Sequence, residues 1–236
     1  STAIDAGAPL VNLGDVENKG FDLAVSYGDE TESGFSYDLS FNLSHYKNEV
    51  TNLINDAPVN GRGDLRTGAI TRTEVGDEMS YFYGREVEGL DSNGRMIFAD
   101  VNGDGSVNDD DRTKIGSPHP DFTYGFNASV AYKGFDAQIF FTGSQGNDIF
   151  NYSKFFTDFG GFVQGNRSDR VLDAWTPSNT DTNVPAVTLS YPSEESSTNS
   201  YFVEDGSYLK LKNLQIGYTL PTSASAPPMF VLLAQK

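Results

Sequence analysis

Residues 98–113, FADVNGDGSVNDDDRT, combine carboxylates and amides at a spacing that suits a metal ion. Oxygen-bearing side chains recur at alternate positions from Asp100, and Gly105 stands at the sixth position, where calcium loops turn sharply. Glycine adopts the positive φ of such a turn at little cost. Oxygens spaced in this way converge on one hard cation. The expected ligands are, in order, Asp100, Asn102, Asp104, Ser106 through its backbone carbonyl, Asn108 and Asp111.

This pattern departs from a complete EF-hand in two respects. Asp111 stands where the usual ligand is a bidentate Glu, and the flanking residues do not form two amphipathic helices. We therefore expect a structural Ca²⁺ site that fixes a long connection and has no catalytic part. Flexible oxygen ligands suit Ca²⁺ better than Mg²⁺. Mg²⁺ is the alternative ion. A solvated acidic turn is the alternative to any metal site.

No other residues form a recognisable catalytic set. The chain has no Cys and only two His, His45 and His119, for which we expect no shared metal or catalytic role. No G-x-S-x-G elbow marks a nucleophile. A glycosidase needs two carboxyl groups across a cleft, which sequence cannot reveal. We predict that the protein is not an enzyme, and the sequence assigns neither catalytic nor substrate-binding residues.

The charge and composition of the chain narrow the class of protein. Its 16 basic and 33 acidic residues give a net charge of −17, which argues against nucleic acid as a partner. No polybasic run favours an anionic membrane surface. Without cysteine, neither disulfides nor thiolate metal sites are possible. The 17 Phe, 12 Tyr and 24 Gly indicate a β-rich protein.

Alternating apolar and polar residues predict antiparallel strands of about ten residues. Residues 20–28 and 35–44 form one hairpin around the polar turn at 28–34. A second hairpin reverses at Lys133 and Gly134. A later segment, 214–220, alternates in the same way, and MFVLLAQ at 229–235 resembles a further strand. Each strand carries one aromatic or aliphatic face and one small polar face.

Two architectures suit such strands. A soluble sandwich buries the apolar face, whereas a membrane β-barrel turns that face to lipid and the polar face to its lumen. Long strands and long connections at 51–121 and 143–208 favour the barrel. The connections show little regular pattern apart from a short helix expected at 168–175, with Ser168 as its N-cap.

Several motifs together resemble one family, the SusC/RagA-type TonB-dependent outer-membrane transporters of Bacteroidetes. The motifs are VENKGFDLAVSYG, FSYDLSFNLSHYKNEV, GREVEGL, FADVNGDGSVNDDDRTKIGSPHPDFTYGFNASVAYKGFD, DAWTPSNTDTNVP and YFVEDGSYLKLKNLQIGYTLP. They cover nearly the whole chain in the same order as in the C-terminal part of the family's barrel. The resemblance is therefore more specific than any single motif.

The resemblance implies a fold and a set of partners. The fold is all-β, an antiparallel long-stranded meander that forms part of a large transmembrane β-barrel with long extracellular loops. The family imports glycan or peptide oligomers across the outer membrane. It works with a SusD-like surface lipoprotein over the barrel mouth and draws energy from the TonB complex through an N-terminal plug. A large family barrel surrounded by outer-membrane lipid would need more strands than this chain supplies.

We therefore expect residues 1–236 to be a fragment, a partial barrel of about eight to ten strands without plug domain and closing strands. The loop at 98–113 would lie within a long extracellular connection. Two other functions compete with nutrient import. A secreted calcium-stabilised β-rich domain that binds glycan would bury its apolar faces, and a glycan-cleaving enzyme would require a convergent carboxylate pair.

Overall fold

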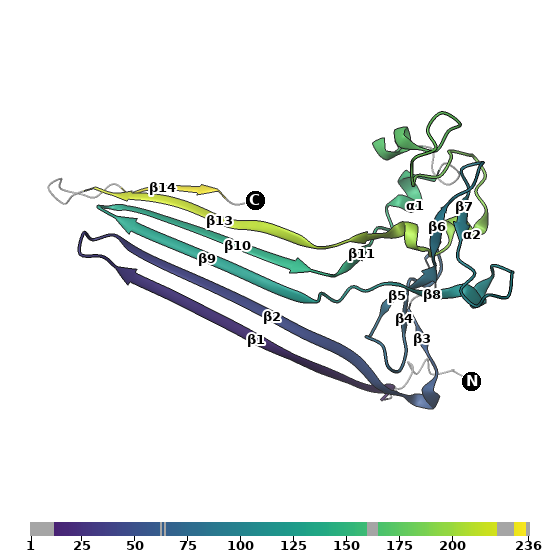
Figure 1. Ribbon diagram of the computed structural model, residues 1–236, viewed down its shortest axis with the longest axis horizontal. Helices are drawn as coiled ribbons and strands as arrows, with labels where there is room; N and C mark the ends of the chain where they lie inside the picture. Colours follow the sequence, from purple (N-terminus) through teal and green to yellow (C-terminus); the bar gives the residue numbers. More distant parts are fainter. Residues whose placement is uncertain (1–11, 62, 64, 160–164, 221–228, 235–236) are drawn as a thin grey trace, which may run out of the picture.

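The computed structural model describes residues 12–61, 63, 65–159, 165–220 and 229–234. A long antiparallel sheet leads at one end into a folded loop region, which we define as residues 54–121 and 146–207 (Figure 1). The six strands of the sheet run in the order β1-β2-β9-β10-β13-β14. Their bounds are β1 (Gly14–Glu30), β2 (Ser36–Leu53), β9 (Phe122–Tyr132), β10 (Phe135–Gln145), β13 (Tyr208–Thr219) and β14 (Met229–Ala234).

The register confirms the two faces predicted from alternation. Val25 pairs with Phe41, which pairs with Phe126, and these side chains share what we call the apolar face. One residue further along, Ser26 pairs with Ser40 and Ser40 with Asn127 on the opposite, polar face. The apolar face is largely exposed, with 56% of Val25 and 39% of Phe41 accessible to solvent. Its other exposed members include Phe21, Leu23, Tyr27, Leu39, Val130, Phe135 and Ile216.

The predicted reversal at Lys133 and Gly134 is confirmed. Both residues have positive φ, 48° and 85°, and Tyr132 pairs with Phe135 across the two-residue loop. Positive φ at both central positions is typical of a type I′ turn, whose twist matches that of the flanking strands. The turn therefore sets the register of β9 against β10.

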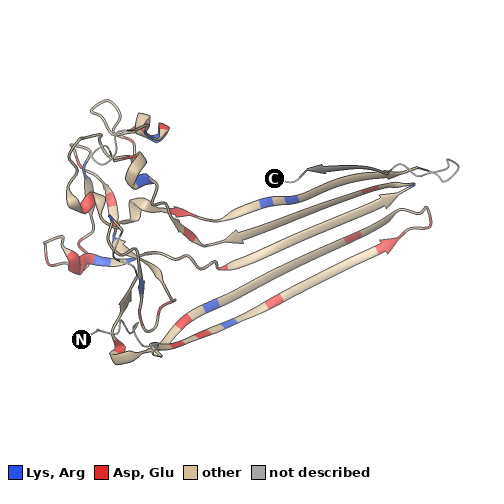
Figure 2. Cartoon of the chain, turned by 180° about the vertical axis from the view of Figure 1, so that it is seen from behind, with Lys and Arg blue, Asp and Glu red and all other residues tan. Residues whose placement is uncertain are grey.

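The expected strand length and number are wrong in part. Strands β1 and β2 have 17 and 18 residues, because they continue past the apolar stretch into a charged end near the loop region. There the ammonium of Lys19 lies 2.7 Å from Glu17, and that of Lys47 lies 2.7 Å from Glu49. Figure 2 shows these charges at the loop-region end of β1 and β2. Among the described residues the large sheet holds six strands, fewer than expected.

The long connections are more regular than their sequences indicate. A four-stranded sheet runs in the order β3-β4-β5-β8, and two further pairs, β6 with β7 and β11 with β12, flank it. Their strands are β3 (Val59–Asn60), β4 (Thr71–Thr73), β5 (Tyr81–Arg85), β6 (Val87–Leu90), β7 (Met96–Phe98), β8 (Arg112–Gly116), β11 (Asp148–Phe150) and β12 (Val203–Asp205). Most of them are too short to show alternation, which is why the sequence reveals little pattern here.

The helices of the loop region are short. They are α1 (Lys154–Thr157), α2 (Ser193–Ser196) and 3₁₀ turns at Ile54–Asp56, Asp109–Asp111, Asp169–Asp173 and Ser200–Phe202. The helix expected at 168–175 is the 3₁₀ turn Asp169–Asp173, and the Ser168 hydroxyl accepts the N–H of Arg170 at 3.2 Å as predicted. None of the described helices is long and apolar enough to cross a membrane.

A hydrophobic core lies in the loop region, and among the described residues of the large sheet only Val50 and Leu53, at the end of β2, are buried apolar residues. Met96, Phe155, Phe159 and Phe202 are buried together. The rings of Phe150 and Phe202 are 5.5 Å apart, and Phe82 from the first connection lies 5.9 Å from Phe150 in the second. Both connections therefore fold as one unit, while the large sheet leaves its apolar face uncovered.

Candidate functional site

The loop region packs against one end of the polar face. The side chain of Asn48, on that face of β2, accepts the N–H of Met79 at 2.8 Å, and the N–H of Val50 donates to the carbonyl of Asp77 at 2.8 Å. A ring nitrogen of His119 lies 2.8 Å from the carbonyl of Met79. Asn48 and Val50 are consequently buried. The loop region thus covers the end of the polar face, and His119 has a packing role there.

The rest of the polar face carries hydrogen-bonding groups. The Gln138 amide donates to Asn127 at 3.0 Å across β9 and β10. A shallow cavity of about 330 Å³ lies further from the loop region, where Asp38, Asp136 and Gln215 join Gln138. Phe140, the exception to the alternation in β10, also lies on this face, opposite Asn127. Such a face suits a water-filled lumen or a polar partner better than lipid.

The acidic loop between β7 and β8 curls as the sequence predicts. The Asp100 carboxylate accepts N–H groups from Gly103 and Gly105, each at 2.8 Å, and Gly105 has a φ of +84°. The N–H of Ser106 donates to Asp104 at 2.8 Å, and that of Asp104 donates to Asn102 at 2.9 Å. Side-chain oxygens are thus directed to backbone amides inside a tight turn.

Asp111 closes this loop from a buried position. Its carboxylate accepts the N–H groups of Asn108 at 2.8 Å and Asn102 at 3.3 Å. The bond from Asn108, followed by that from Asn102, lowers the pKa of Asp111 below its usual range. The guanidinium of Arg85 in β5 donates hydrogen bonds to the Asp109 carboxylate at 2.9 Å and to the Asn108 carbonyl at 3.2 Å, and so holds the end of the loop against β5.

The structure thus draws the six expected ligand residues into one loop. Within the described part of the chain, however, no three carboxylate or imidazole side chains are arranged as a ready metal site. The donor set still suits a hard cation, because an ionised carboxylate offers about four lone-pair sites. Asp100 uses three of its sites on backbone N–H groups, and Asp111 uses two on the N–H groups of Asn102 and Asn108. The calcium site stays a prediction.

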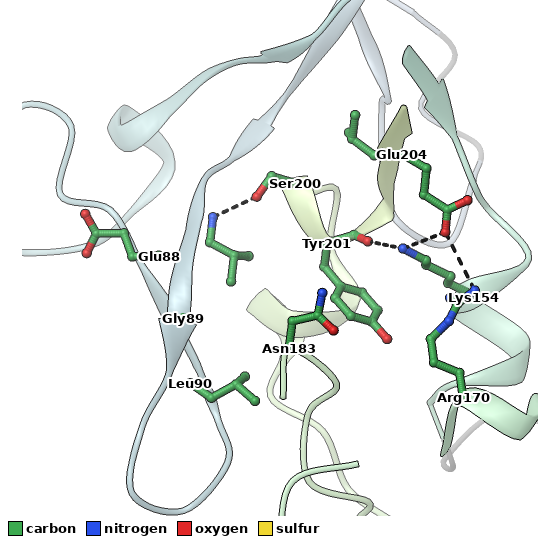
Figure 3. Close-up of a pocket in the computed structure, with 11 residues that line it drawn as sticks. Glu88, Gly89, Leu90, Lys154, Arg170, Asn183, Ser200, Tyr201 and Glu204 are labelled. Atoms are coloured by element: carbon green, nitrogen blue, oxygen red, sulfur yellow. Dashed lines mark hydrogen bonds and ion pairs between the residues drawn. The ribbon is translucent and has the colours of Figure 1, made fainter. Parts of the chain in front are cut away.

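A cavity of about 480 Å³ lies between the two connections (Figure 3). Strand β6 forms one wall, with Glu88 and Leu90, and the opposite wall comes from the second connection. The Ser200 hydroxyl accepts the N–H of Val87 at 2.9 Å and so joins the walls. The cavity combines apolar and charged side chains.

The charged side chains of this cavity form a paired network. The Lys154 side chain is only 9% exposed, and its ammonium lies 2.8 Å from Glu204 and 2.6 Å from the Tyr201 carbonyl. Arg170 lies 3.0 Å from Asp158, whose side chain is 1% exposed. The Tyr201 hydroxyl also donates to Asp158, at 2.7 Å. Burial, followed by this bond, raises the pKa of Tyr201 well above its usual range, so the phenol stays protonated.

Sequence reasoning missed this cavity. Lys154 and Glu204 are fifty positions apart, and no local spacing links either of them to β6. Only the packing of Phe155 and Phe202 in the shared core brings α1 and β12 together. No signal in a single sequence would have identified the cluster.

Comparison with known proteins gives a consistent result. No family model matches the chain. It is 35% identical over 237 residues to TonB-dependent receptor P3 of Formosa agariphila and 30% identical over 238 residues to receptor P26 of that organism, covering 91% and 90% of this chain. It is 26% identical to the TonB-dependent receptor SusC of Bacteroides thetaiotaomicron, over 88% of this chain. It spans about a quarter of these relatives' length, 23%, 23% and 21% respectively.

Solved structures agree in fold. The chain matches the RagAB peptide transporter with a TM-score of 0.76 and 26% identity, over 95% of this chain and 26% of that one. The match to the RagAB peptide importer in its "open-open" state is equal in TM-score and covers 94% of this chain. The large sheet is accordingly part of a transporter-type β-barrel, as predicted. In sequence and in fold, this chain belongs with the SusC/RagA-type TonB-dependent receptors and corresponds to a segment of their barrel.

Proposed function

We propose that the chain forms part of the wall and mouth of an outer-membrane importer that takes up nutrient oligomers. One observation carries this proposal: a long sheet exposes a continuous apolar face, including Val25 and Phe41, while its opposite face is polar. Lipid would cover the apolar face, and solute would pass along the polar face. The loop region would then lie at the extracellular mouth. No bond chemistry is required of this segment.

The partners that we propose are those that the family resemblance implies. A SusD-like lipoprotein would close over the mouth, and the TonB complex would supply energy through a plug that other parts of the protein provide. The cargo would be an oligosaccharide or a peptide. The localisation would be the outer membrane of a Gram-negative, Bacteroidetes-type cell. A secreted glycan-binding domain fits less well, because such a domain would bury the apolar face that this structure exposes.

Uptake by whole cells tests the proposal. The complete receptor is expressed with its lipoprotein in cells with or without TonB, and uptake of labelled oligosaccharides and peptides is measured. We expect saturable uptake of one class that disappears without TonB. Uptake that persists without TonB, or recovery of the receptor in the soluble fraction, would contradict the proposal.

We also propose that the loop at 100–111 holds one Ca²⁺ ion with a structural role. The support is the curled loop, in which Gly105 has positive φ and Asp100 and Asp111 retain lone pairs. Calcium would neutralise several nearby carboxylates and fix the loop to β8.

Calcium titration of the purified receptor tests the site. We expect one binding event that Asp104→Ala weakens by about tenfold or more, the effect of losing one charged ligand. Ser106→Ala is the control, because that residue would bind through its backbone carbonyl. Equal calcium binding by Asp104→Ala and the unmodified receptor would refute this assignment.

A further inference from the structure

The cavity between β6 and the second connection has the composition of a binding site for an uncharged polar molecule. It is formed by both long connections, since Glu88 and Leu90 come from the first and Arg170, Tyr201 and Glu204 from the second. Its volume of about 480 Å³ falls in the range of small-molecule sites. A ligand here would set the class of cargo, and its role rests on the proposed import function.

The cations of the cavity are already neutralised by the protein. Lys154 is paired with Glu204 at 2.8 Å, and Arg170 with Asp158 at 3.0 Å. Glu88 adds one further negative charge to the lining. An anionic ligand would therefore meet no uncompensated cation and would enter a chain with a net charge of −17. Acidic oligomers are disfavoured.

Hydrogen-bonding capacity nevertheless remains at the surface of the cavity. Arg170 is 36% exposed, and its Nη2 lies 3.7 Å from Glu204, too far for a hydrogen bond, so guanidinium donors can reach a ligand. The Glu204 side chain is 39% exposed and retains lone pairs beyond those used by Lys154 and Asn151. Asn183 is exposed and offers one acceptor and two donors. The lining thus offers both donors and acceptors.

Apolar side chains line the cavity together with these groups. The half-buried side chains of Val87, Leu90 and Val203 line the cavity beside the ring of Tyr201. Figure 3 shows Leu90 and Tyr201 on opposite sides of Asn183. A sugar ring has the matching chemistry: hydroxyl groups that donate and accept at its edge, and C–H groups on its faces. The two termini of a short peptide would instead require an unpaired cation and an unpaired carboxylate at a fixed distance.

We propose that this cavity binds a neutral saccharide unit of the cargo, with Arg170, Asn183 and Glu204 bonding its hydroxyl groups and Leu90 and Tyr201 contacting its ring. Planar polar side chains can bond two neighbouring hydroxyl groups at once. Because both connections contribute, bound sugar would bridge β6 to the segment leading into β13.

Calorimetry on the complete receptor with its lipoprotein tests the proposal. The probes are a panel of short neutral oligosaccharides, the corresponding acidic oligosaccharides, and short peptides. We expect a neutral oligosaccharide to bind, with Asn183→Ala and Glu204→Gln each weakening binding about tenfold. Glu32→Gln, in the far turn between β1 and β2, is the matched control and should bind normally.

Hydrogen exchange on the same samples locates the ligand and checks the fold of each variant. Neutral sugar should slow exchange at 87–90 and 200–204 in the unmodified receptor but not in Asn183→Ala. The proposal is overturned if no neutral oligosaccharide binds, if the variants bind as the control does, or if peptides or acidic sugars give the variant-sensitive binding. TonB-dependent uptake is measured in parallel. If uptake is normal but no neutral oligosaccharide binds at this cavity, the saccharide proposal is wrong and the import proposal stands. If uptake does not depend on TonB, the import proposal itself is wrong.

Discussion

The ammonium of Lys154 lies 2.8 Å from the carboxylate of Glu204 and so joins helix α1 to strand β12, just ahead of barrel strand β13. The lysine side chain is 9% exposed, and Glu204 is its carboxylate partner at that largely buried position. The pair thereby links the cavity of the loop region to the wall of the barrel.

Removal of this ion pair should loosen the second connection. Glu204→Gln leaves the buried Lys154 charge without a carboxylate, and we expect the free energy of local opening to fall by about 1–3 kcal/mol. Hydrogen exchange of residues 148–157 in the complete receptor measures this free energy of local opening. Lys154→Met/Glu204→Gln, which removes the charge as well, should recover part of the loss. No recovery would show that the pair itself contributes little.

The pair of Lys154 and Glu204 should also make the stability of the second connection depend on pH. The hydrogen bond from Lys154 lowers the pKa of Glu204 below its ordinary value of 4.5. Its contribution to stability is therefore full above pH 4.5 and is lost as the pH falls through the lower, folded-state pKa. Exchange at 148–157 should accelerate there, and Glu204→Gln should remove that part of the pH dependence. An unchanged pH profile in the variant would contradict the assignment.

Glu195 should make stability depend on pH in the opposite direction. Its side chain is 2% exposed, and burial raises its pKa although the Met96 N–H and Arg95 bond it. Because the pKa of Glu195 in the folded state lies above 4.5, its contribution to stability is full at lower pH. That contribution declines as the pH rises through the folded-state pKa. Arg95→Met should strengthen this dependence on pH, because it removes the cation paired with Glu195. Breaking such a buried pair costs about 3–5 kcal/mol of stability near neutral pH.

Protease cleavage of the loop region checks this prediction when it is measured from about pH 4 to about pH 7, a range that spans the titration of a carboxyl group with a raised pKa. Arg95→Met should be cleaved much faster at the upper end and only slightly faster at the lower end. Lys114→Met, which removes a cation from the more exposed pairs with Asp77 and Glu78, is the control. Equal sensitivity of Arg95→Met at both ends would argue against a buried charge on Glu195.

The two faces of the sheet predict opposite responses to a new charge. Phe126 lies on the apolar face between Phe41 and Phe141, whereas its neighbour Asn127 lies on the polar face. Phe126→Lys should destabilise the inserted barrel by about 2–4 kcal/mol near the membrane midplane. Asn127→Lys is the matched control. Folding yield in lipid vesicles distinguishes them, and equal yields would overturn the assignment of lipid to the apolar face.

Gly105 offers a test of backbone strain in the acidic loop. Its φ is +84°, and a Cβ added there would meet no atom within 4 Å, so substitution acts through the backbone alone. Gly105→Ala should cost about 1–2 kcal/mol. Faster protease cleavage at 98–113 would show it, with Ser106→Ala as control. Identical cleavage of both variants would mean that the turn does not depend on glycine.

The sequence by itself determined the strands, their faces and their tightest turn. Alternation over long runs is a local signal, so Val25 and Phe41 could be placed on one face, and Lys133-Gly134 could be recognised as a turn, without knowledge of their partners. The curl of the acidic loop was also predictable, because Asp100 and Gly105 act within one short segment. Phe140 broke the pattern and lies on the polar face.

Only the tertiary structure decided how the two long connections fold together. Phe82 packs on Phe150, and the Thr67 carbonyl accepts both the N–H and the hydroxyl of Thr198 at 2.9 Å, across more than a hundred residues. Contacts of such sequence separation leave no periodic trace, since each short strand is specified by its partner and not by its own residues. The paired charges of Lys154 and Glu204 arise from that packing. The large sheet is therefore readable from local alternation, whereas the fold of the loop region depends on distant contacts.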